Sequence, residues 1–237
     1  MTSTPFRFKQ FDIHHDRTAM KVGTDGVLLG AIAGIGNPQS ILEIGVGSGV
    51  VSLMLAQRFP QAKITGVEID SEAWKQATEN AENSPWSERI EFVNMSFQEY
   101  CGLTSQKFDL IVSNPPYFPN HLKSIDPQRN LALHNDALPF TEMASGISGL
   151  LNLESEIWVI LPPSQMAEFE RILDSLGLKF FNKVNVKDKP SKNILRMIYG
   201  FSFYNHSISE KDLSIKMENG NFSDEYSELL RNFLTIF

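Results

Sequence analysis

A strand, a glycine turn and the start of a helix follow one another between residues 41 and 53. The apolar residues 41–44 precede glycines at 45, 47 and 49, which allow a tight turn and a close approach of the backbone to a ligand. This G-x-G-x-G spacing is one residue short of the dinucleotide pattern G-x-G-x-x-G. Glu43, at the strand end, would repel a pyrophosphate, whereas it suits a cofactor with an ammonium and a sulfonium group. The pattern therefore favours an α/β sheet that binds a cationic nucleoside cofactor.

A second strand, predicted over residues 63–70, carries an acid at its end. Glu68 lies 23 positions after Gly45. In nucleoside-binding folds with this alternation of strands and helices, the acid at that place accepts hydrogen bonds from the ribose hydroxyls. Asp70 stands beside Ser71 and is better explained as the N-cap of the next helix. Glu68 is therefore the predicted ribose ligand.

Another apolar run, residues 108–113, stops at Asn114-Pro115-Pro116-Tyr117. Proline disfavours the α region for the residue before it, so Asn114 is expected to leave the strand in an extended turn. Neither proline donates a backbone hydrogen bond, which leaves the carbonyls of the turn as acceptors without competing donors. Acceptors beside an aromatic ring fit a planar base with an exocyclic amine. The alternative is a simple strand-ending turn, which Asn and Pro commonly build.

The chemistry of such an amine explains why two acceptors are useful. Its lone pair is delocalised into the ring, so the nitrogen is a poor nucleophile. Hydrogen bonds from the amine to the Asn114 side-chain oxygen and the Pro115 carbonyl would draw the nitrogen toward tetrahedral geometry and free the lone pair. Tyr117 would stack on the base, worth about 1 to 3 kcal/mol. No general base is required before transfer, because the proton can leave afterwards.

Composition limits the compartment and the partners. The 237 residues suit one α/β domain, and 21 basic against 28 acidic residues give a net charge of −7, so a polyanion has to be met by a local patch. Cys101 is the single cysteine, which excludes an internal disulfide and fits a reducing compartment. The opening residues are charged where a secretory signal needs an apolar core, and no apolar run approaches the ~18 residues of a membrane span. We therefore expect a soluble, cytoplasmic protein.

The opening residues also predict a helix and offer a group of histidines. Thr24-Asp25-Gly26 precedes the apolar residues 27–32, so a helix is expected there with Thr24 or Asp25 as its N-cap. His14-His15-Asp16 has side chains of the metal-ligand type, but adjacent residues point to different sides and no Cys or His cluster completes a site. No metal site is predicted.

The order of these elements resembles the class I S-adenosylmethionine-dependent methyltransferases, and the Asn-Pro-Pro-Tyr turn resembles their amino-methylating members. Residues 8–11 (FKQF) and 21–30 (KVGTDGVLLG) further resemble the tRNA1(Val) (adenine-N6)-methyltransferases. The resemblance implies a Rossmann-like, seven-stranded, mostly parallel α/β sheet with helices on both faces. It also implies S-adenosylmethionine as cofactor and methyl transfer to N6 of adenine 37, just 3′ of the anticodon, in the anticodon loop of that tRNA.

The resemblance assigns roles to individual residues. The methionine part of the cofactor would lie along Gly45 and Gly47, with its amino group near Glu43 and its ribose on Glu68. The residues implied to close over the cofactor are Thr24, Asp25 and Gly26. The residues implied to form the catalytic turn are Asn114, Pro115, Pro116 and Tyr117, with Asn114 also facing the cofactor. Where many relatives place an acid that binds the cofactor's adenine, this chain has Ser96, which can form a hydrogen bond without charge.

Basic residues gather where an RNA backbone could run. Residues 183–196 contain five bases and one acid, whereas residues 68–99 contain eight acids and two bases. Strands are predicted near 178–186 and 195–204. In the usual class I order these are a parallel sixth strand and an antiparallel seventh strand, so their connection overhangs the carboxyl edge of the sheet, beside the cofactor. We predict that the loop 118–136 covers the target base. The predicted RNA contacts are Lys187, Lys189, Lys192 and Arg129. For the lysines, a solvated polar hairpin is the alternative.

The domain division expected is one methyltransferase domain over 1–237, acting as a monomer. It consists of an N-terminal cofactor-closing segment and helix (1–35), a core sheet (36–206) and a C-terminal extension (207–237). In the extension, a helix near 223–233 is expected to serve packing and not recognition.

Other classes of function share part of the pattern. Glutamine methyltransferases that act on release factors carry the same Asn-Pro-Pro-Tyr turn, because a carboxamide nitrogen presents the same activation problem. They generally carry a helical substrate domain before the core, whereas 23 residues precede Thr24 here. A non-catalytic or NAD-dependent nucleotide-binding module would leave Glu43 and the proline turn unexplained. A serine hydrolase is not supported, because Val46 breaks the G-x-S-x-G pattern around Ser48.

Overall fold

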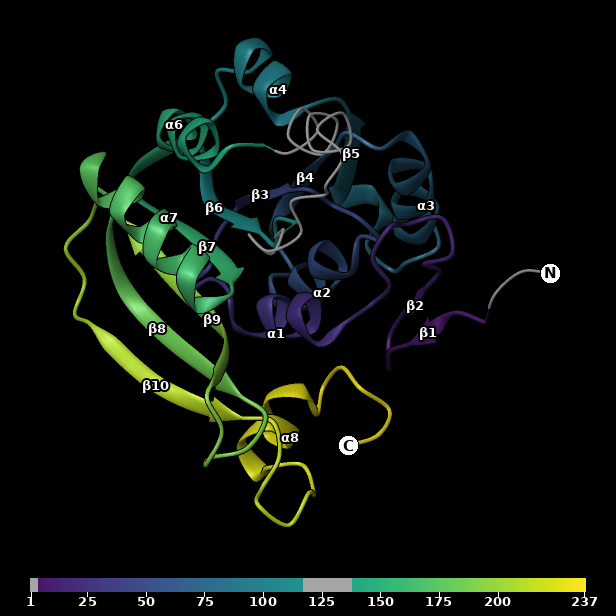
Figure 1. Cartoon of the computed structure of the whole chain (residues 1–237). Helices are drawn as coiled ribbons and strands as arrows, with labels where there is room; N and C mark the ends of the chain where they lie inside the picture. Colours follow the sequence, from purple (N-terminus) through teal and green to yellow (C-terminus); the bar gives the residue numbers. More distant parts are fainter. Residues whose placement is uncertain (1–3, 117–137) are drawn as a thin grey trace, which may run out of the picture.

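The apolar runs of the sequence form one large sheet with helices on both faces (Figure 1). A computed structural model describes residues 4–116 and 138–237. The elements in chain order are β1 (Phe6–Arg7), β2 (Asp12–Ile13), α1 (Thr24–Ile32), β3 (Ser40–Ile44), α2 (Val50–Arg58), β4 (Lys63–Glu68), α3 (Ser71–Glu82), a 3-10 turn (Ser87–Arg89), β5 (Ile90–Asn94), α4 (Phe97–Leu103), β6 (Phe108–Ser113), α6 (Phe140–Leu150), β7 (Leu151–Leu161), α7 (Pro163–Ser175), β8 (Lys179–Lys187), β9 (Ile194–Ser202), β10 (Ser209–Ser214) and α8 (Asp224–Leu230).

The strand order of the large sheet is β10-β8-β9-β7-β6-β3-β4-β5. The strands from β5 across to β7 pair in parallel. β9 is antiparallel to both of its neighbours, β7 and β8, so β8 runs in the same direction as the main group. The predicted parallel sixth strand and antiparallel seventh strand are therefore confirmed.

The sheet has eight strands among the described residues, so the expected number of seven was wrong. The additional strand, β10, pairs in parallel with β8. It belongs to the segment predicted as a C-terminal extension, and that segment therefore completes the sheet. Its short run of exposed charged residues gives no apolar signal in the sequence, and such residues suit an edge strand because they discourage further pairing.

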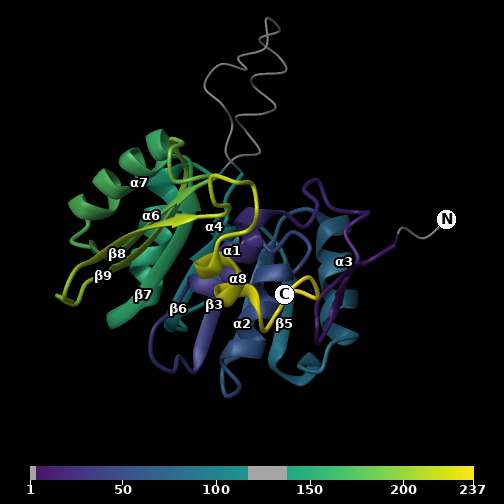
Figure 2. The same cartoon turned by 90° about the horizontal axis from the view of Figure 1, so that it is seen from below.

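Successive strand residues face opposite layers of the core. Ile41 packs with α1 and α2, whereas its neighbour Leu42 packs with α4, α6 and α7, and both are fully buried. Such burial on both faces is typical of a parallel sheet covered by helices. Figure 2 shows the two layers, with α6 and α7 on one side of the sheet and α1, α2 and α8 on the other.

The C-terminal segment packs against the N-terminal hairpin. Tyr226 and Leu230 of α8 are buried in the same cluster as Phe8, which confirms the packing role predicted for this helix. The backbone N–H of Lys9 donates to the Phe233 carbonyl at 2.8 Å. The N-terminal hairpin and the residues after α8 therefore contact each other.

The described helices are short. The longest, α7, has 13 residues, whereas a helix needs about 20 apolar residues to cross a bilayer. Within residues 4–116 and 138–237, no helix meets that requirement.

Candidate active site

The glycine turn after β3 has the tight backbone conformation that its glycine spacing predicts. Gly45, Gly47 and Gly49 have φ values of +77°, +55° and +82°, a region that other residues rarely adopt. A β-carbon at Gly45 or Gly47 would meet no atom of the described residues within 4 Å, whereas one at Gly49 would contact Ala77 and Phe92. The first two glycines therefore border open space, and the third seats the turn on α3 and β5.

A further glycine, Gly66 in β4, lies beneath this turn. The buried Val46 side chain packs directly over it, and a β-carbon at position 66 would overlap Val46 Cγ2 and the Phe92 ring. Because both neighbours are themselves packed, neither can move aside without cost. Because glycine at position 66 has no side chain, Val46 and the glycine turn can lie close to β4.

Glu43 lies below the turn and is almost fully buried. Its Oε2 accepts hydrogen bonds from the Ser52 backbone N–H, at 3.0 Å, and from the Ser52 hydroxyl. Burial raises the pKa of Glu43 to about 8; the Ser52 bonds oppose this rise, and the charge of Glu68 adds to it. The carboxyl group ties the first turn of α2 to β3. Its contact with a cofactor ammonium stays a prediction.

Glu68 links the end of β4 to the glycine turn. Its Oε2 accepts from the Gly47 N–H at 2.8 Å, and its Oε1 accepts from the Asp70 N–H at 2.9 Å. The structure therefore brings together the acid and the turn that the sequence spacing connects. Asp70 caps α3 as expected, because its carboxylate accepts two backbone N–H groups of the first helical turn.

Asn114 leaves the sheet beside the glycine turn. Ile44 and Ser113 are register partners in the parallel pair β3–β6, and the Ser113 hydroxyl donates to the Ile44 carbonyl at 2.8 Å. The residues that follow them, Gly45 and Asn114, therefore leave the carboxyl edge next to each other. Asn114 Oδ1 is buried and has no hydrogen-bond partner among the described residues. Since buried acceptors are normally satisfied, this oxygen is available to a donor on a ligand.

The remainder of the catalytic turn is only partly described. Pro115 is buried and Pro116 is exposed. Tyr117, the loop 118–136 and Arg129 lie outside the described residues, so their predicted contacts with the base and with RNA stay predictions.

The helix expected after the opening segment is present as α1, but its predicted N-cap was wrong. Gly23 is the N-cap, and Thr24 and Asp25 belong to the first turn. The Asp25 carboxylate accepts instead from Arg196 Nε of β9, at 2.7 Å. An acid in the first turn still interacts favourably with the helix dipole without serving as a cap.

Gly26, the third residue of the predicted closing segment, is buried between two helices. A β-carbon there would lie 3.1 Å from Val50 Cγ1 at the start of α2. Val50 directly follows Gly49, so Gly26 brings the start of α1 close to the glycine turn. Its position is explained by helix packing, and a direct cofactor contact stays a prediction.

Ser96 serves as the N-cap of α4. Its hydroxyl accepts from the Glu99 N–H at 3.2 Å, and Glu99 Oε2 accepts in return from the Ser96 N–H at 2.9 Å, which together form a capping box. The Ser96 hydroxyl also donates to Glu99 Oε2 at 2.7 Å. These bonds lower the pKa of Glu99. The hydroxyl is thus satisfied within the helix start, and the predicted contact with the cofactor's adenine stays a prediction.

The predicted RNA-binding lysines differ in their availability. Lys187 forms an ion pair with Asp212 of β10 and lowers the pKa of that carboxyl group. Lys189 Nζ donates to the Glu218 carbonyl at 3.3 Å, whereas Lys192 is exposed and forms no ion pair with any described residue. Because β8 runs parallel to β6, the β8–β9 loop emerges at the same edge of the sheet as Asn114, as predicted.

Sequence reasoning missed Asn94, the last residue of β5. Its Nδ2 donates to the carbonyls of Glu68, at 2.8 Å, and Ile69, at 3.2 Å. It therefore fixes the backbone on both sides of the predicted ribose ligand. An amide at the end of an apolar strand was the available signal, but only the strand pairing shows which backbone it reaches.

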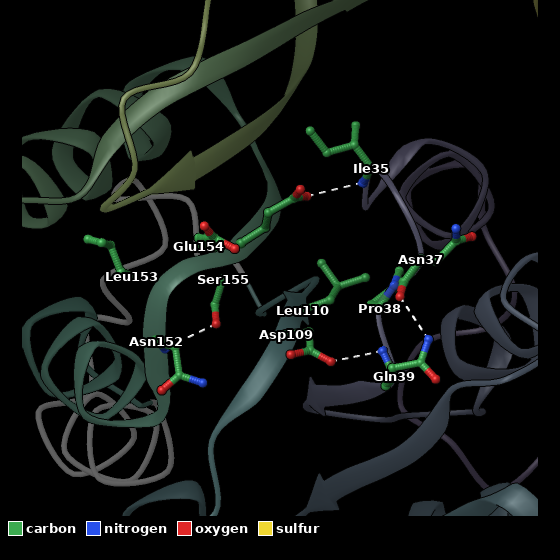
Figure 3. A pocket seen from close by; sticks show the side chains of 11 residues that line it. Ile35, Asn37, Pro38, Gln39, Asp109, Leu110, Asn152, Leu153, Glu154 and Ser155 are labelled. Atoms are coloured by element: carbon green, nitrogen blue, oxygen red, sulfur yellow. Dashed lines mark hydrogen bonds between the residues drawn. The ribbon is translucent and has the colours of Figure 1, made fainter.

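A cavity of about 610 Å³ lies near the start of β6, away from these residues (Figure 3). Two of its carboxylates have partners within the protein: Asp109 Oδ2 accepts from the Gln39 and Ser40 N–H groups at 2.8 and 2.9 Å, and Glu156 Oε2 accepts from Trp158 Nε1 at 2.7 Å. None of the predicted site residues that the structure describes lines it. The candidate site is therefore the carboxyl edge and not this hollow.

No cluster of three or more His, Cys, Asp or Glu side chains suited to a metal ion occurs in the described part of the chain. The structure does bring together features predicted for a nucleoside site: the open space at Gly45 and Gly47, the carboxylate of Glu68 and the unpaired oxygen of Asn114.

Comparison with known proteins agrees with this geometry. A family model described as a methyltransferase domain matches residues 41–132. Among solved structures, a predicted O-methyltransferase from Agrobacterium tumefaciens has the same fold, with a TM-score of 0.69 and 18% identity over 88% of this chain and 96% of that chain. S-adenosylmethionine is the methyl donor of this fold class, and the site residues fit it.

Curated relatives match over almost the full length. Proteins from Bacteroides thetaiotaomicron and Pseudoalteromonas translucida are each 42% identical to this chain, over 98% and 96% of its residues and 98% and 97% of their own. Both are named tRNA1(Val) (adenine(37)-N6)-methyltransferase. Identity of this degree over nearly the whole chain shows that it belongs to the tRNA1(Val) (adenine(37)-N6)-methyltransferase family, within the class I S-adenosylmethionine-dependent methyltransferases.

Proposed function

We propose that the protein transfers a methyl group from S-adenosylmethionine to the N6 amino group of adenine 37 in tRNA1(Val). The observation that carries the proposal is the buried, unpartnered Asn114 Oδ1 beside the open glycine turn. A site that only held a nucleotide would have no use for an unsatisfied acceptor at this place. The names of the full-length relatives support the substrate.

The catalytic turn would act by orienting the amine and freeing its lone pair. Asn114 Oδ1 and the Pro115 carbonyl would each accept one N–H of the adenine amino group, and Tyr117 would stack on the ring. The cofactor supplies an electrophilic methyl group on a sulfonium. The freed lone pair of the amine would face this carbon, so that the new nitrogen–carbon bond would form as the carbon–sulfur bond breaks, with the electron pair of that bond going to sulfur. The surplus amine proton then leaves to water.

The glycine turn and its neighbours would hold the cofactor in line with this amine. Glu68 would exchange the Gly47 N–H for the ribose hydroxyls, and Glu43 would lie near the ammonium group. Thr24, Asp25 and Gly26 would close the site from α1, and Ser96 would reach the adenine of the cofactor. Only a cofactor complex can test these four assignments together.

The substrate is proposed to reach the site along the β8–β9 loop. Lys189 and Lys192 are the better candidates for phosphate contacts, since Lys187 is already paired with Asp212. Arg129 is proposed to contact the RNA as well, and the loop 118–136 to cover the target base. A base in the single-stranded anticodon loop leaves its stack at low cost, which suits a recessed acceptor. We propose a cytoplasmic monomer.

The test uses methyl-labelled S-adenosylmethionine with three substrates. These are a tRNA1(Val) transcript, the same transcript with guanine in place of adenine 37, and a release factor. The expected result is label on the first transcript alone, recovered as N6-methyladenosine by nucleoside mass analysis. Label on a glutamine of the release factor would instead establish the glutamine methyltransferase alternative.

A further inference from the structure

Two buried amide side chains on α3 are not explained by the core. Gln76 and Asn80 are 1% and 3% exposed, in a stripe otherwise made of the alanines at 73, 77 and 81. A buried amide is costly unless its donors and acceptors find partners. Their partners therefore show what these residues are for.

The amides bind the backbone of the segment between β2 and α1, residues 14–23, which we call the strap. Asn80 Oδ1 accepts from the His14 N–H at 3.0 Å, and Asn80 Nδ2 donates to the His14 carbonyl at 2.8 Å. Gln76 Oε1 accepts from the Arg17 N–H at 3.0 Å. In Figure 1 the strap is the purple segment that runs past α3 before it enters α1.

Asn80 makes one contact that Gln76 does not. The same Nδ2 group donates to the carbonyl of Ser48 at 2.9 Å, within the glycine turn. Both N–H donors of the amide are thus used, one on the strap and one on the turn. One buried side chain therefore joins the glycine turn to the segment that leads into Thr24, Asp25 and Gly26.

The strap is also closed on itself. The Val22 N–H donates to His15 Nδ1 at 3.0 Å, so the end of the strap nearest α1 is tied to the part that Asn80 and Gln76 hold. Displacement at His14 would therefore pass to the first turn of α1. The glycine turn has one internal bond, from the Gly49 N–H to the Val46 carbonyl at 2.9 Å, and three of its five residues are glycines with positive φ.

We propose that Asn80 is a positioning residue for the cofactor. It fixes the glycine turn and the strap in one arrangement before S-adenosylmethionine arrives. Glycine-rich backbone loses much conformational freedom when it is ordered, and a site already in its bound shape avoids that loss on binding. Asn80 acts through Ser48 and His14 and does not touch the cofactor itself. The inference rests on the cofactor site of the proposed function, not on the tRNA.

The test compares three alanine variants on α3. Asn80→Ala removes the strap and turn bonds, Gln76→Ala removes only strap bonds, and Asn83→Ala removes an exposed amide that bonds within its own helix. Calorimetric titration with S-adenosylmethionine should give a Kd about 10-fold higher for Asn80→Ala, the scale of one buried hydrogen bond. Gln76→Ala should raise it clearly less, and Asn83→Ala should leave it unchanged. With saturating cofactor, kcat of Asn80→Ala should stay within about 2-fold of the parent.

Two further measurements separate positioning from mere destabilisation. Hydrogen exchange should show faster exchange at residues 45–49 in Asn80→Ala but not in Gln76→Ala, with both proteins folded. Asn80→Asp keeps the side-chain volume and the acceptor for His14 while losing both donors, so it should bind cofactor as poorly as Asn80→Ala. An unchanged Kd in Asn80→Ala, or equal losses in Asn80→Ala and Gln76→Ala, would overturn the proposal. Cofactor binding is measured without RNA, so failure to methylate tRNA would leave this result intact.

Discussion

The two edges of the sheet differ in how their polar groups are satisfied. At the amino edge, around the cavity of Figure 3, Asp109 and Glu156 accept hydrogen bonds from neighbouring backbone and side-chain groups. At the carboxyl edge, Asn114 Oδ1 is buried without a partner, and Gly45 and Gly47 border open space. The cavity therefore lies at the amino edge, whereas the buried acceptor without a partner, Asn114 Oδ1, lies at the carboxyl edge. The Asn114 oxygen together with the open glycine turn therefore indicates the active site better than the cavity does.

The strongest test of this difference makes the same change at both edges. Asn114→Ala should lower kcat for methyl transfer by about 10² or more, the scale of losing one preorganised electrostatic contact. Asn152→Ala, at the amino-edge cavity, should leave kcat within about 2-fold. Single-turnover assays with labelled cofactor measure both. Near-normal transfer by Asn114→Ala would remove the proposed role of the turn.

The buried acids of the two edges offer a second test, through pH. Glu43 keeps its proton in the folded protein up to a pKa of about 8, against an ordinary value of 4.5. Between these values the folded state binds more protons than the unfolded state, so this contribution to stability is complete below about pH 4.5 and is lost as pH rises through about 8. The slope is at most about 1.4 kcal/mol per pH unit.

Urea unfolding between pH 5 and 8 measures this slope. Wild type should lose stability as pH rises, and Glu43→Gln should lose distinctly less. Glu156→Gln is the amino-edge comparison, since burial raises the pKa of Glu156 as well. The two edges should diverge when S-adenosylmethionine is added, because its ammonium would favour the charged form of Glu43 alone. A slope for wild type that cofactor leaves untouched would separate Glu43 from the binding site.

A third test concerns the lysines at the carboxyl edge. The double change Lys189→Ala with Lys192→Ala should weaken tRNA binding by about 10-fold and reduce the slope of log K against log salt by about 1.5, for two lost phosphate contacts. Lys187→Ala should have a smaller effect, because its ammonium is shared with Asp212. Fluorescence anisotropy at several salt concentrations gives both quantities. Equal slopes in all three proteins would favour the solvated-hairpin alternative.

The smallest effect on activity is expected at Asp109. Its carboxylate binds two backbone N–H groups that join β3 and β6 at the amino edge, so Asp109→Ala should lower the free energy of unfolding by about 1 to 2 kcal/mol. Turnover at 25 °C should not change. Thermal unfolding together with a methyl-transfer assay checks this, and a selective loss of turnover would show that the amino edge shares in catalysis.

The sequence predicted those parts of the fold that rest on local patterns. The glycine turn and the parallel strands around it follow from glycine spacing, apolar runs and the order of elements. The antiparallel seventh strand was implied by the resemblance to the class I methyltransferases. β10 was not predicted because a charged, exposed edge strand lacks the alternation of apolar residues that indicates a strand. The N-cap of α1 was misplaced by one or two residues because Asp25 has a partner, Arg196, that is 171 positions away in the chain.

The candidate site divides in the same way. The proximity of Glu68 to Gly47 and of Asn114 to Gly45 could be predicted, since each pair lies at neighbouring strand ends. Asn80 could not, because its three bonds join segments 32 and 66 positions apart along the chain. The ion pair of Lys187 with Asp212 could not be predicted either, because it depends on strand β10, which was not predicted.

Gly66 has a consequence for how variants of this protein should be interpreted. It touches no proposed ligand, yet any side chain there would push Val46 upward and lift the turn that Gly47 and Glu68 hold together. A substitution at position 66 would thus weaken cofactor binding, although Gly66 does not line the proposed site. The position of the proposed nucleoside site thus depends on a residue that lies beneath the glycine turn and does not face the ligand.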